Sequence, residues 1–310
     1  MKTALLVTVL GLFAVAALPH AQEPSKQEDR RPVIRAQVDV VNVLCTVRDR
    51  KGKGKYVEGL KKEDFEVFEN NVRQELQYFN HGMGEDAEPL SIALLIDASG
   101  SVRGKLGIEQ RAAVDFLRTS LRKDKDLAAV VQFSEDVKVL RDFTYDDKLL
   151  EDAIMDIRAA GATKLYDAVW LASTDMLSKE VGRRVILVLS DGDDTLSDVS
   201  EREAIRTAQE NDAVVFGIGV RGSDTNYGSL RRFARDTGGL FVDAEVSLPE
   251  LREAFAKING DIKNQYSLGY VSKNPARDGA FRELKIRVKR SGLNVKHRKG
   301  YYAPQADDEK

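Results

Sequence analysis

The sequence predicts an α/β protein in which an open, doubly wound parallel sheet is accompanied by a small β-sandwich. Three observations lead to this fold class. Apolar strand-like runs alternate with helical segments between residues 88 and 263, which is typical of a sheet covered by helices on both faces. Stretches rich in β-branched residues precede and follow that region, and neither has enough strands for a stable sheet alone. The 310 residues are 42% hydrophobic, which favours packed domains over disorder.

The first 21 residues have the pattern of an export signal. Lys2 gives a positive start, residues 4–18 are an apolar run, and residues 19–21 end it. Because a membrane span needs about 20 apolar residues, we expect cleavage, most naturally after Ala21, rather than a retained anchor. The product would be periplasmic or extracellular, with no transmembrane segment after cleavage. Polar residues 22–32 then form a spacer.

A first β segment follows the spacer. Residues 33–47 are rich in valine and predict a strand, and residues 65–79 predict a hairpin around Asn70 and Asn71, which tolerate positive φ. Cys45 is the only cysteine, so an internal disulfide framework and a cysteine-rich zinc site are both excluded. It lies in an apolar run, which predicts a buried, inert thiol.

The elements of the central region follow from apolar runs and helical spacing. Strands are predicted at 91–96, 127–133, 137–140, 184–190, 213–220 and 240–242. Helices are predicted at 105–122, 146–158, 165–178, 199–211, from residue 227, and at 248–263. Strands return at 266–271, 281–288 and 295–302.

We expect the β segments on the two sides of this region to pack together as the sandwich. The predicted parts of the chain are a signal peptide at 1–21, a spacer at 22–32, a β segment at 33–80, the α/β domain at 88–263, a C-terminal β segment at 264–304 and a disordered tail at 305–310.

Two central strands of the predicted sheet each lead into an aspartate, Asp97 and Asp191. In a doubly wound sheet, ligands bind outside the carboxyl ends of the strands. No basic residue adjoins either aspartate on the same turn, so the two would repel each other unless a cation lies between them. Ser99 and Ser101 add hydroxyl groups beside Asp97. Carboxylates and hydroxyls suit a hard cation, Mg²⁺ before Mn²⁺ or Ca²⁺.

The order of these residues resembles the von Willebrand factor A family over about residues 88–263. Its metal-ion-dependent adhesion site reads Asp-x-Ser-x-Ser, then a threonine in a middle loop, then an aspartate after a later strand. The matching positions are Asp97, Ser99, Ser101, Thr163 and Asp191. The resemblance implies a Rossmann-like domain whose metal is bound directly by Ser99, Ser101 and Thr163, and by the two aspartates directly or through water.

The same resemblance implies a non-catalytic, adhesion-type protein. An open coordination position on the metal would accept a carboxylate from a protein partner. The flanking sequences, among them the terminal Arg-Lys-Gly-Tyr-Tyr-Ala-Pro, are similar to secreted bacterial "VWFA-related" proteins of acidobacterial type. That similarity supports export without naming a partner.

Two alternatives to this function stay open at the level of sequence. Residues 191–196 resemble the nucleophile loop of haloacid dehalogenases, in which Asp191 would attack a phosphoryl group with Mg²⁺ and Asp193 as acid/base. Asp194 stands where that loop has glycine. The second alternative is a structural scaffold that binds no metal.

Composition excludes other classes. The chain has 48 basic and 50 acidic side chains and a net charge of −2, which excludes a globally basic nucleic-acid binder. Its histidines, His20, His81 and His297, lie too far apart in sequence for a paired zinc-hydrolase motif.

Overall fold

The structure is a computed structural model that describes residues 40–50, 54–82, 87–192, 194–222 and 225–305. The predicted signal, the spacer, residues 33–39 of the first β segment and residues 306–310 of the tail lie outside the described residues. Gln305 is described and forms an isolated β-bridge with Asp278.

A six-stranded sheet lies at the centre of the α/β domain. Its order is β10-β9-β8-β5-β6-β7, and the five strands from β10 to β6 are parallel neighbours. The strands are β5 (Leu90–Asp97), β6 (Leu127–Phe133), β7 (Val137–Thr144), β8 (Arg183–Ser190), β9 (Ala213–Val220) and β10 (Phe241–Ala244). Every residue of β5 and β9 is buried, as continuous apolar runs predict for strands covered on both faces. The predicted doubly wound sheet is therefore confirmed.

The edge strand β7 departs from the parallel pattern. It pairs antiparallel with β6 because only residues 134–136 connect the two, too few for the crossover that a parallel pair needs. It also extends to Thr144, four residues beyond the predicted strand.

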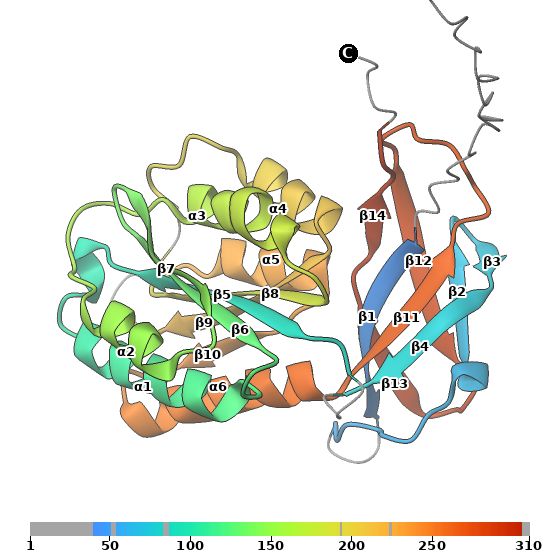
Figure 1. The fold of residues 1–310 in the computed structure, drawn as a ribbon, viewed down its shortest axis with the longest axis horizontal. Coiled ribbons are helices and arrows are strands. Elements are labelled where there is room, and N and C mark those ends of the chain that lie inside the picture. The colour runs from blue at the N-terminus through green and yellow to red at the C-terminus, as the bar shows by residue number, and fades with distance from the viewer. Residues whose placement is uncertain (1–39, 51–53, 83–86, 193, 223–224, 306–310) are drawn as a thin grey trace, which may run out of the picture. The chain divides into compact units, whose positions relative to one another are not determined.

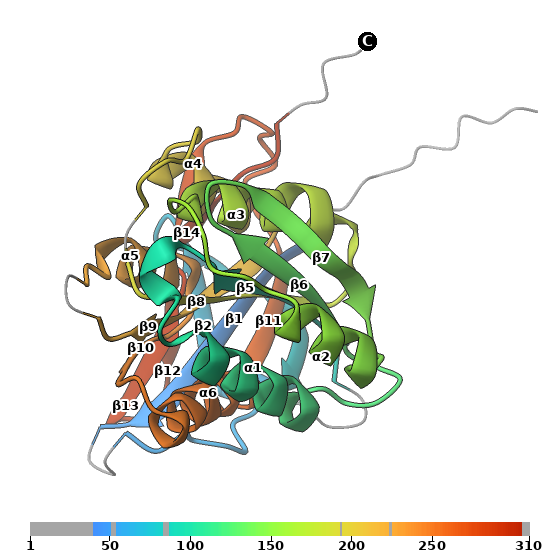
Figure 2. The same cartoon turned by 90° about the vertical axis from the view of Figure 1, so that its left-hand side faces the viewer.

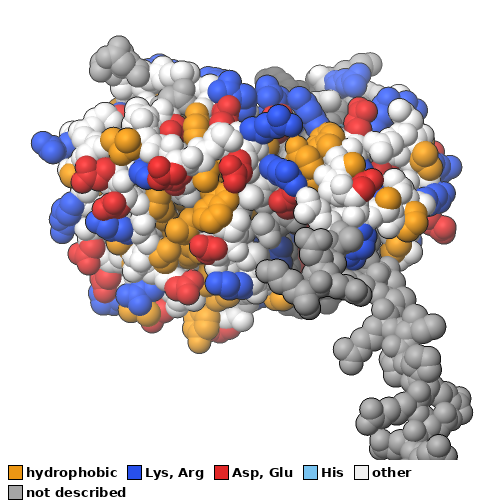
Figure 3. Space-filling model, turned by 90° about the horizontal axis from the view of Figure 1, so that it is seen from above, with side chains coloured by type: hydrophobic (Ala, Val, Ile, Leu, Met, Phe, Trp, Pro, Cys, Tyr) orange, Lys and Arg blue, Asp and Glu red, His pale blue; other side chains and the backbone are white. Residues whose placement is uncertain are grey.

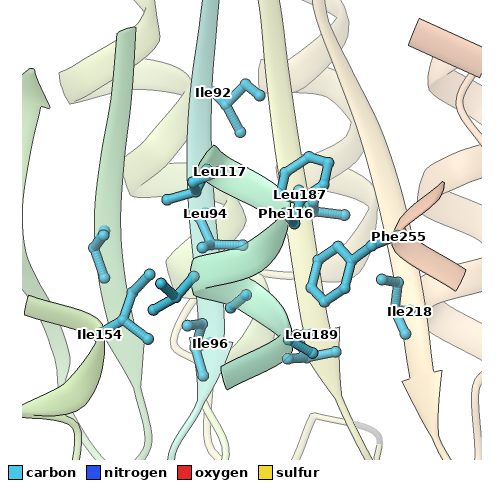
Figure 4. Packing of buried hydrophobic residues seen from close by; sticks show 14 of the residues in the cluster. Ile92, Leu94, Ile96, Phe116, Leu117, Ile154, Leu187, Leu189, Ile218 and Phe255 are labelled. Carbon is cyan, nitrogen blue, oxygen red and sulfur yellow. The ribbon is translucent and has the colours of Figure 1, made fainter. Parts of the chain in front are cut away.

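Helices cover both faces of this sheet (Figure 1). One core joins the sheet to α1 (Leu106–Ser120), α2 (Asp147–Met155) and α6 (Leu248–Lys263). The other joins it to α3 (Leu165–Leu171), α4 (Glu201–Glu210) and α5 (Gly228–Thr237). In Figure 2, α3 and α4 lie above the sheet and α1 and α6 lie below it. In the first core, Phe116 and Leu117 of α1 lie over Leu94 and Leu187 of the sheet (Figure 4), and Phe116 stacks on Phe255 of α6 with ring centroids 4.8 Å apart.

The helix predicted over residues 165–178 changes type along its length. The α-helix ends at Leu171, residues 172–176 form a π-turn and residues 177–179 a 3-10 turn. Hydroxyl groups bond back to the helix at this change, where Ser173 donates to Val169 O at 2.7 Å and Thr174 to Trp170 O at 2.9 Å. Such bonds back to the preceding turn compete with regular helix geometry.

Segments before and after the α/β domain form two antiparallel four-stranded sheets. One has the order β13-β1-β11-β4 and the other β14-β12-β2-β3. The strands are β1 (Val40–Asp49), β2 (Phe65–Glu69), β3 (Val72–Gln74), β4 (Leu76–His81), β11 (Gln265–Val271), β12 (Phe281–Val288), β13 (Leu293–His297) and β14 (Gly300–Tyr302). Buried side chains of both sheets share one core, which includes Val43, Cys45, Val67, Tyr270 and Ile286. The predicted β-sandwich is confirmed, and Cys45 is buried in it.

The strand predicted over residues 295–302 is wrong as a single element. It is two strands, β13 and β14, that belong to different sheets. The chain changes sheets at Arg298, whose buried guanidinium donates to Asn42 O at 2.8 Å and Gln209 O at 3.2 Å. Gly300 then begins β14, where a Cβ atom would lie only 2.4 Å from Arg282 O, so a larger residue would not fit there.

No helix among the described residues is both long and apolar enough to cross a membrane. On the face drawn in Figure 3, acidic and basic side chains are interspersed around apolar patches. The mixed charge of that face agrees with the small net charge of the chain.

Candidate metal centre

The predicted aspartates lie at the carboxyl edge of the six-stranded sheet. Asp97 is the last residue of β5, and Asp191 directly follows β8. These strands are parallel neighbours, with Ile96 opposite Leu189. The two carboxylates therefore leave the sheet at the same edge, where open α/β sheets bind their ligands.

Asp97 is fully buried and held by two hydrogen bonds. The Ser99 N–H donates to its Oδ1 at 2.8 Å, and the Ser190 hydroxyl donates to its Oδ2 at 2.5 Å. Burial raises the pKa of Asp97, the bonds from Ser190 and Ser99 lower it, and the Asp191 carboxylate raises it further. The loop and the neighbouring strand thus fix this carboxylate in one orientation.

Two serine hydroxyls connect the loop after β5 to Asp191. The hydroxyls of Ser99 and Ser101 lie 2.9 Å apart, and the Ser101 hydroxyl donates to Asp191 Oδ1 at 3.0 Å. Ser99 is buried and Ser101 is exposed. Four of the five predicted ligands are therefore connected by hydrogen bonds: the Ser99 N–H joins the loop to Asp97, and the two serine hydroxyls join it to Asp191.

Thr163 belongs to a loop that docks on the serine loop. The Ala160 N–H donates to Ala98 O at 2.7 Å, and the Gly100 N–H donates to Gly161 O at 3.0 Å. Thr163 is buried, but within the described part of the chain its hydroxyl has no hydrogen bond to the other four predicted ligands. Thr163 thus lies in the adjoining loop, and among the described residues its side chain has no hydrogen bond to the other four predicted ligands.

Lys105 brings a basic side chain to Asp191 from outside the turn that carries Asp97 and the serines. Its Nζ lies 2.6 Å from Asp191 Oδ2, and both side chains are less than a tenth exposed. Lys105 is the N-cap residue of α1 and lies four residues beyond Ser101 in the sequence. The position of Lys105 at the start of the helix predicted at 105–122, just after the serine loop, was the signal in the sequence that could have revealed this ion pair.

Glu109 is a second residue that sequence reasoning missed. It lies one turn after Lys105 in α1 and is fully buried, and neither of its carboxylate oxygens has a hydrogen-bond partner among the described residues. Burial raises the pKa of Glu109 to about 8, Lys105 opposes the shift, and Asp97 and Asp191 add to it. An acidic residue on the apolar face of the helix predicted at 105–122 was its signal in the sequence.

The donors gathered at this edge are all oxygen atoms. Carboxylates and hydroxyls of this kind fit a hard divalent cation such as Mg²⁺. In the described ranges, no three His, Cys, Asp or Glu side chains form a group that could hold a metal ion. A cation at this edge would therefore need the serine and threonine hydroxyls as well as the aspartates.

Comparisons with known proteins agree with this architecture. A family model for the von Willebrand factor type A domain matches residues 91–256. No curated protein sequence matches the chain. The matches do not test the closer similarity to acidobacterial secreted proteins, which stays a prediction.

Two solved structures share the fold at low sequence identity. Proximal thread matrix protein 1 from the mussel byssus, with a zinc-occupied MIDAS motif, is 18% identical with a TM-score of 0.51, over 60% of this chain and 48% of its own. This chain therefore spans about half of the mussel protein. A von Willebrand factor type A protein from Catenulispora acidiphila is 14% identical with a TM-score of 0.51, over 88% of this chain and 76% of its own.

Proposed function

Because the chain belongs to the von Willebrand factor type A domain family, we propose that it is an exported, non-catalytic module that binds a protein partner through a divalent cation. The observation that carries the proposal is the set of hydrogen bonds that connects Asp97 through Ser99 and Ser101 to Asp191 at the sheet edge. These bonds connect the ends of β5 and β8 with the loop before α1, and the carboxylate and hydroxyl oxygens gathered there suit Mg²⁺.

In this proposal Ser99, Ser101 and Thr163 hold the cation directly, and the two aspartates bind it directly or through water. Few direct negative ligands leave the ion electrophilic, so it supplies a site for a carboxylate of the partner. Mn²⁺ and Ca²⁺ are alternatives to Mg²⁺, and the mussel protein's zinc-occupied motif supports a divalent ion in general. Export rests on the signal pattern of residues 1–21.

The phosphohydrolase alternative receives less support from the structure. Asp194, which stands where the dehalogenase loop has glycine, accepts hydrogen bonds from the Tyr166 N–H and the Ser197 hydroxyl, so it holds this loop in a different way. Asp193, its proposed acid/base, lies outside the described residues. Hydrolysis of p-nitrophenyl phosphate in Mg²⁺ that is lost in Asp191→Asn would favour the enzyme.

Calorimetric titration of Mg²⁺ and Mn²⁺ into the metal-stripped chain tests the site. We expect one saturable site, and we expect Asp97→Asn and Ser101→Ala to weaken binding by about 10–100-fold or more. Ser101 is exposed, so its substitution should leave the fold intact. The matched control is Asp198→Asn, because the Asp198 side chain is 84% exposed and pairs with Lys164 instead.

Saturable binding that both site variants weaken and the control retains would support the module. Absence of binding in both the wild type and Lys105→Met, which removes the ammonium beside Asp191, would favour the scaffold alternative. Any partner isolated later should dissociate in EDTA and should fail to bind Ser101→Ala.

A further inference from the structure

Lys105 places a positive charge inside the candidate metal centre. Its ammonium lies 2.6 Å from Asp191 Oδ2, and the two side chains are 9% and 8% exposed. Gly222 leaves the space that the ammonium needs, since a Cβ atom at that position would approach Lys105 Nζ to 3.1 Å. This is a well-formed ion pair at a protected position rather than a loose surface contact.

We propose that Lys105 is a tethered cation that competes with the divalent ion for Asp191, so that displacement of its ammonium sets the affinity of the site for metal. The inference rests on the function proposed above and adds the residue that regulates it.

Competition follows from charge and space. Asp191 has two oxygens, of which Oδ1 accepts the Ser101 hydroxyl and Oδ2 contacts the ammonium. A divalent ion held by Ser101 and Asp191 would lie within a few ångströms of Lys105 Nζ. Like charges at that separation repel strongly where little solvent screens them, so the ammonium must leave when the ion enters.

Glu109 offers the displaced ammonium a new partner. Residues four apart on a helix lie on the same face, which brings Lys105 and Glu109 together at the start of α1. Glu109 is fully buried, and neither of its carboxylate oxygens has a hydrogen-bond partner within the described residues. A buried polar group without a partner costs free energy, so a Lys105–Glu109 contact would offset part of the cost of displacement.

The test is calorimetric titration of Mg²⁺ into four full-length proteins: the wild type, Lys105→Met, Glu109→Gln and the double variant. Methionine keeps the unbranched chain of lysine without its charge. We expect Lys105→Met to lower the Kd for Mg²⁺ by about tenfold, equivalent to ~1.4 kcal/mol. Glu109→Gln should raise the Kd in the wild-type background but leave it unchanged in the Lys105→Met background, because no ammonium is then displaced.

The matched control is Lys148→Met, which removes the same charge at an exposed position of α2 where Lys148 pairs with Asp152. It should leave the Kd unchanged, which separates a local effect of Lys105 from the effect of net charge. Thermal unfolding of each variant without metal checks that the proteins are folded.

The outcomes separate the two proposals. Tighter binding in Lys105→Met, including binding that appears only in that variant, supports the competition. Equal or weaker binding in a folded Lys105→Met, beside a wild type that binds Mg²⁺, overturns the role of Lys105 and leaves the metal site standing. If Glu109→Gln weakens binding equally in both backgrounds, the role of Glu109 as the partner of the displaced ammonium is overturned. If neither the wild type nor Lys105→Met binds Mg²⁺, both proposals fail.

Discussion

Glu109→Gln should change how the stability of the protein depends on pH. Glu109 is fully buried in α1, and its pKa is raised from 4.5 to about 8, chiefly by burial. In the unfolded chain the same carboxyl loses its proton near its ordinary pKa. Between these two values the unfolded state binds fewer protons than the folded state, so the free energy of unfolding of the wild type falls as pH rises.

The size of the effect follows from the width of that pH window. Each pH unit inside it costs about 1.4 kcal/mol per group. The stabilising contribution of the protonated carboxyl is complete below pH 4.5 and is lost as pH rises towards 8. Glutamine does not titrate. The free energy of unfolding of the variant, relative to that of the wild type, should therefore rise by about 3 kcal/mol between pH 5 and pH 7.5.

Urea unfolding at several pH values, with EDTA present to remove metal linkage, measures this difference. The matched control is Glu253→Gln, the same change at an exposed position of α6 where Glu253 pairs with Lys257. The control should track the wild type at every pH. A gap between Glu109→Gln and the wild type that stays constant from pH 5 to pH 7.5 would refute the reasoning, because it would mean that Glu109 titrates alike in both states.

Two further predictions concern other buried groups. Cys45 is buried, and burial raises the pKa of its thiol. Ellman's reagent should therefore modify this thiol only as fast as the protein unfolds, and rapid modification in native buffer would contradict the prediction. Asp261 is fully buried and contacts Arg48 at 3.1 Å and Lys296 at 2.5 Å, so Asp261→Asn should lower the free energy of unfolding by about 3 kcal/mol in urea. A decrease in the free energy of unfolding of less than about 1 kcal/mol would contradict this, because it would mean that water solvates the Arg48 and Lys296 charges once the carboxylate is removed.

Much of the fold could be predicted because its signals are local. The strands predicted at 127–133 and 213–220 and the helix predicted at 248–263 have the bounds that the structure gives them. Continuous apolar runs must be buried on both faces, and helical spacing fixes which face of a helix is covered. Parallel strands then bring their carboxyl ends to one edge, which made the meeting of Asp97 and Asp191 predictable without coordinates.

Other features depended on contacts between distant segments. The change of sheets after β13 requires the Arg298 guanidinium to reach carbonyl groups far away in the sequence, and no local pattern records that. The direction of β7, by contrast, follows from the length of its connection to β6, which the sequence already contained.

The sequence by itself therefore determined the α/β class, the sandwich and the order of the oxygen donors along the chain, because each depends on periodicity or on residue type. Only the tertiary structure decided what surrounds those donors. It brought the Lys105 ammonium to Asp191. Among the described residues, it left the Glu109 carboxyl buried without a hydrogen-bond partner and gave the Thr163 hydroxyl no hydrogen bond to the serines. The reason is physical: burial and charge–charge distance belong to the packed chain, and sequence spacing does not set them.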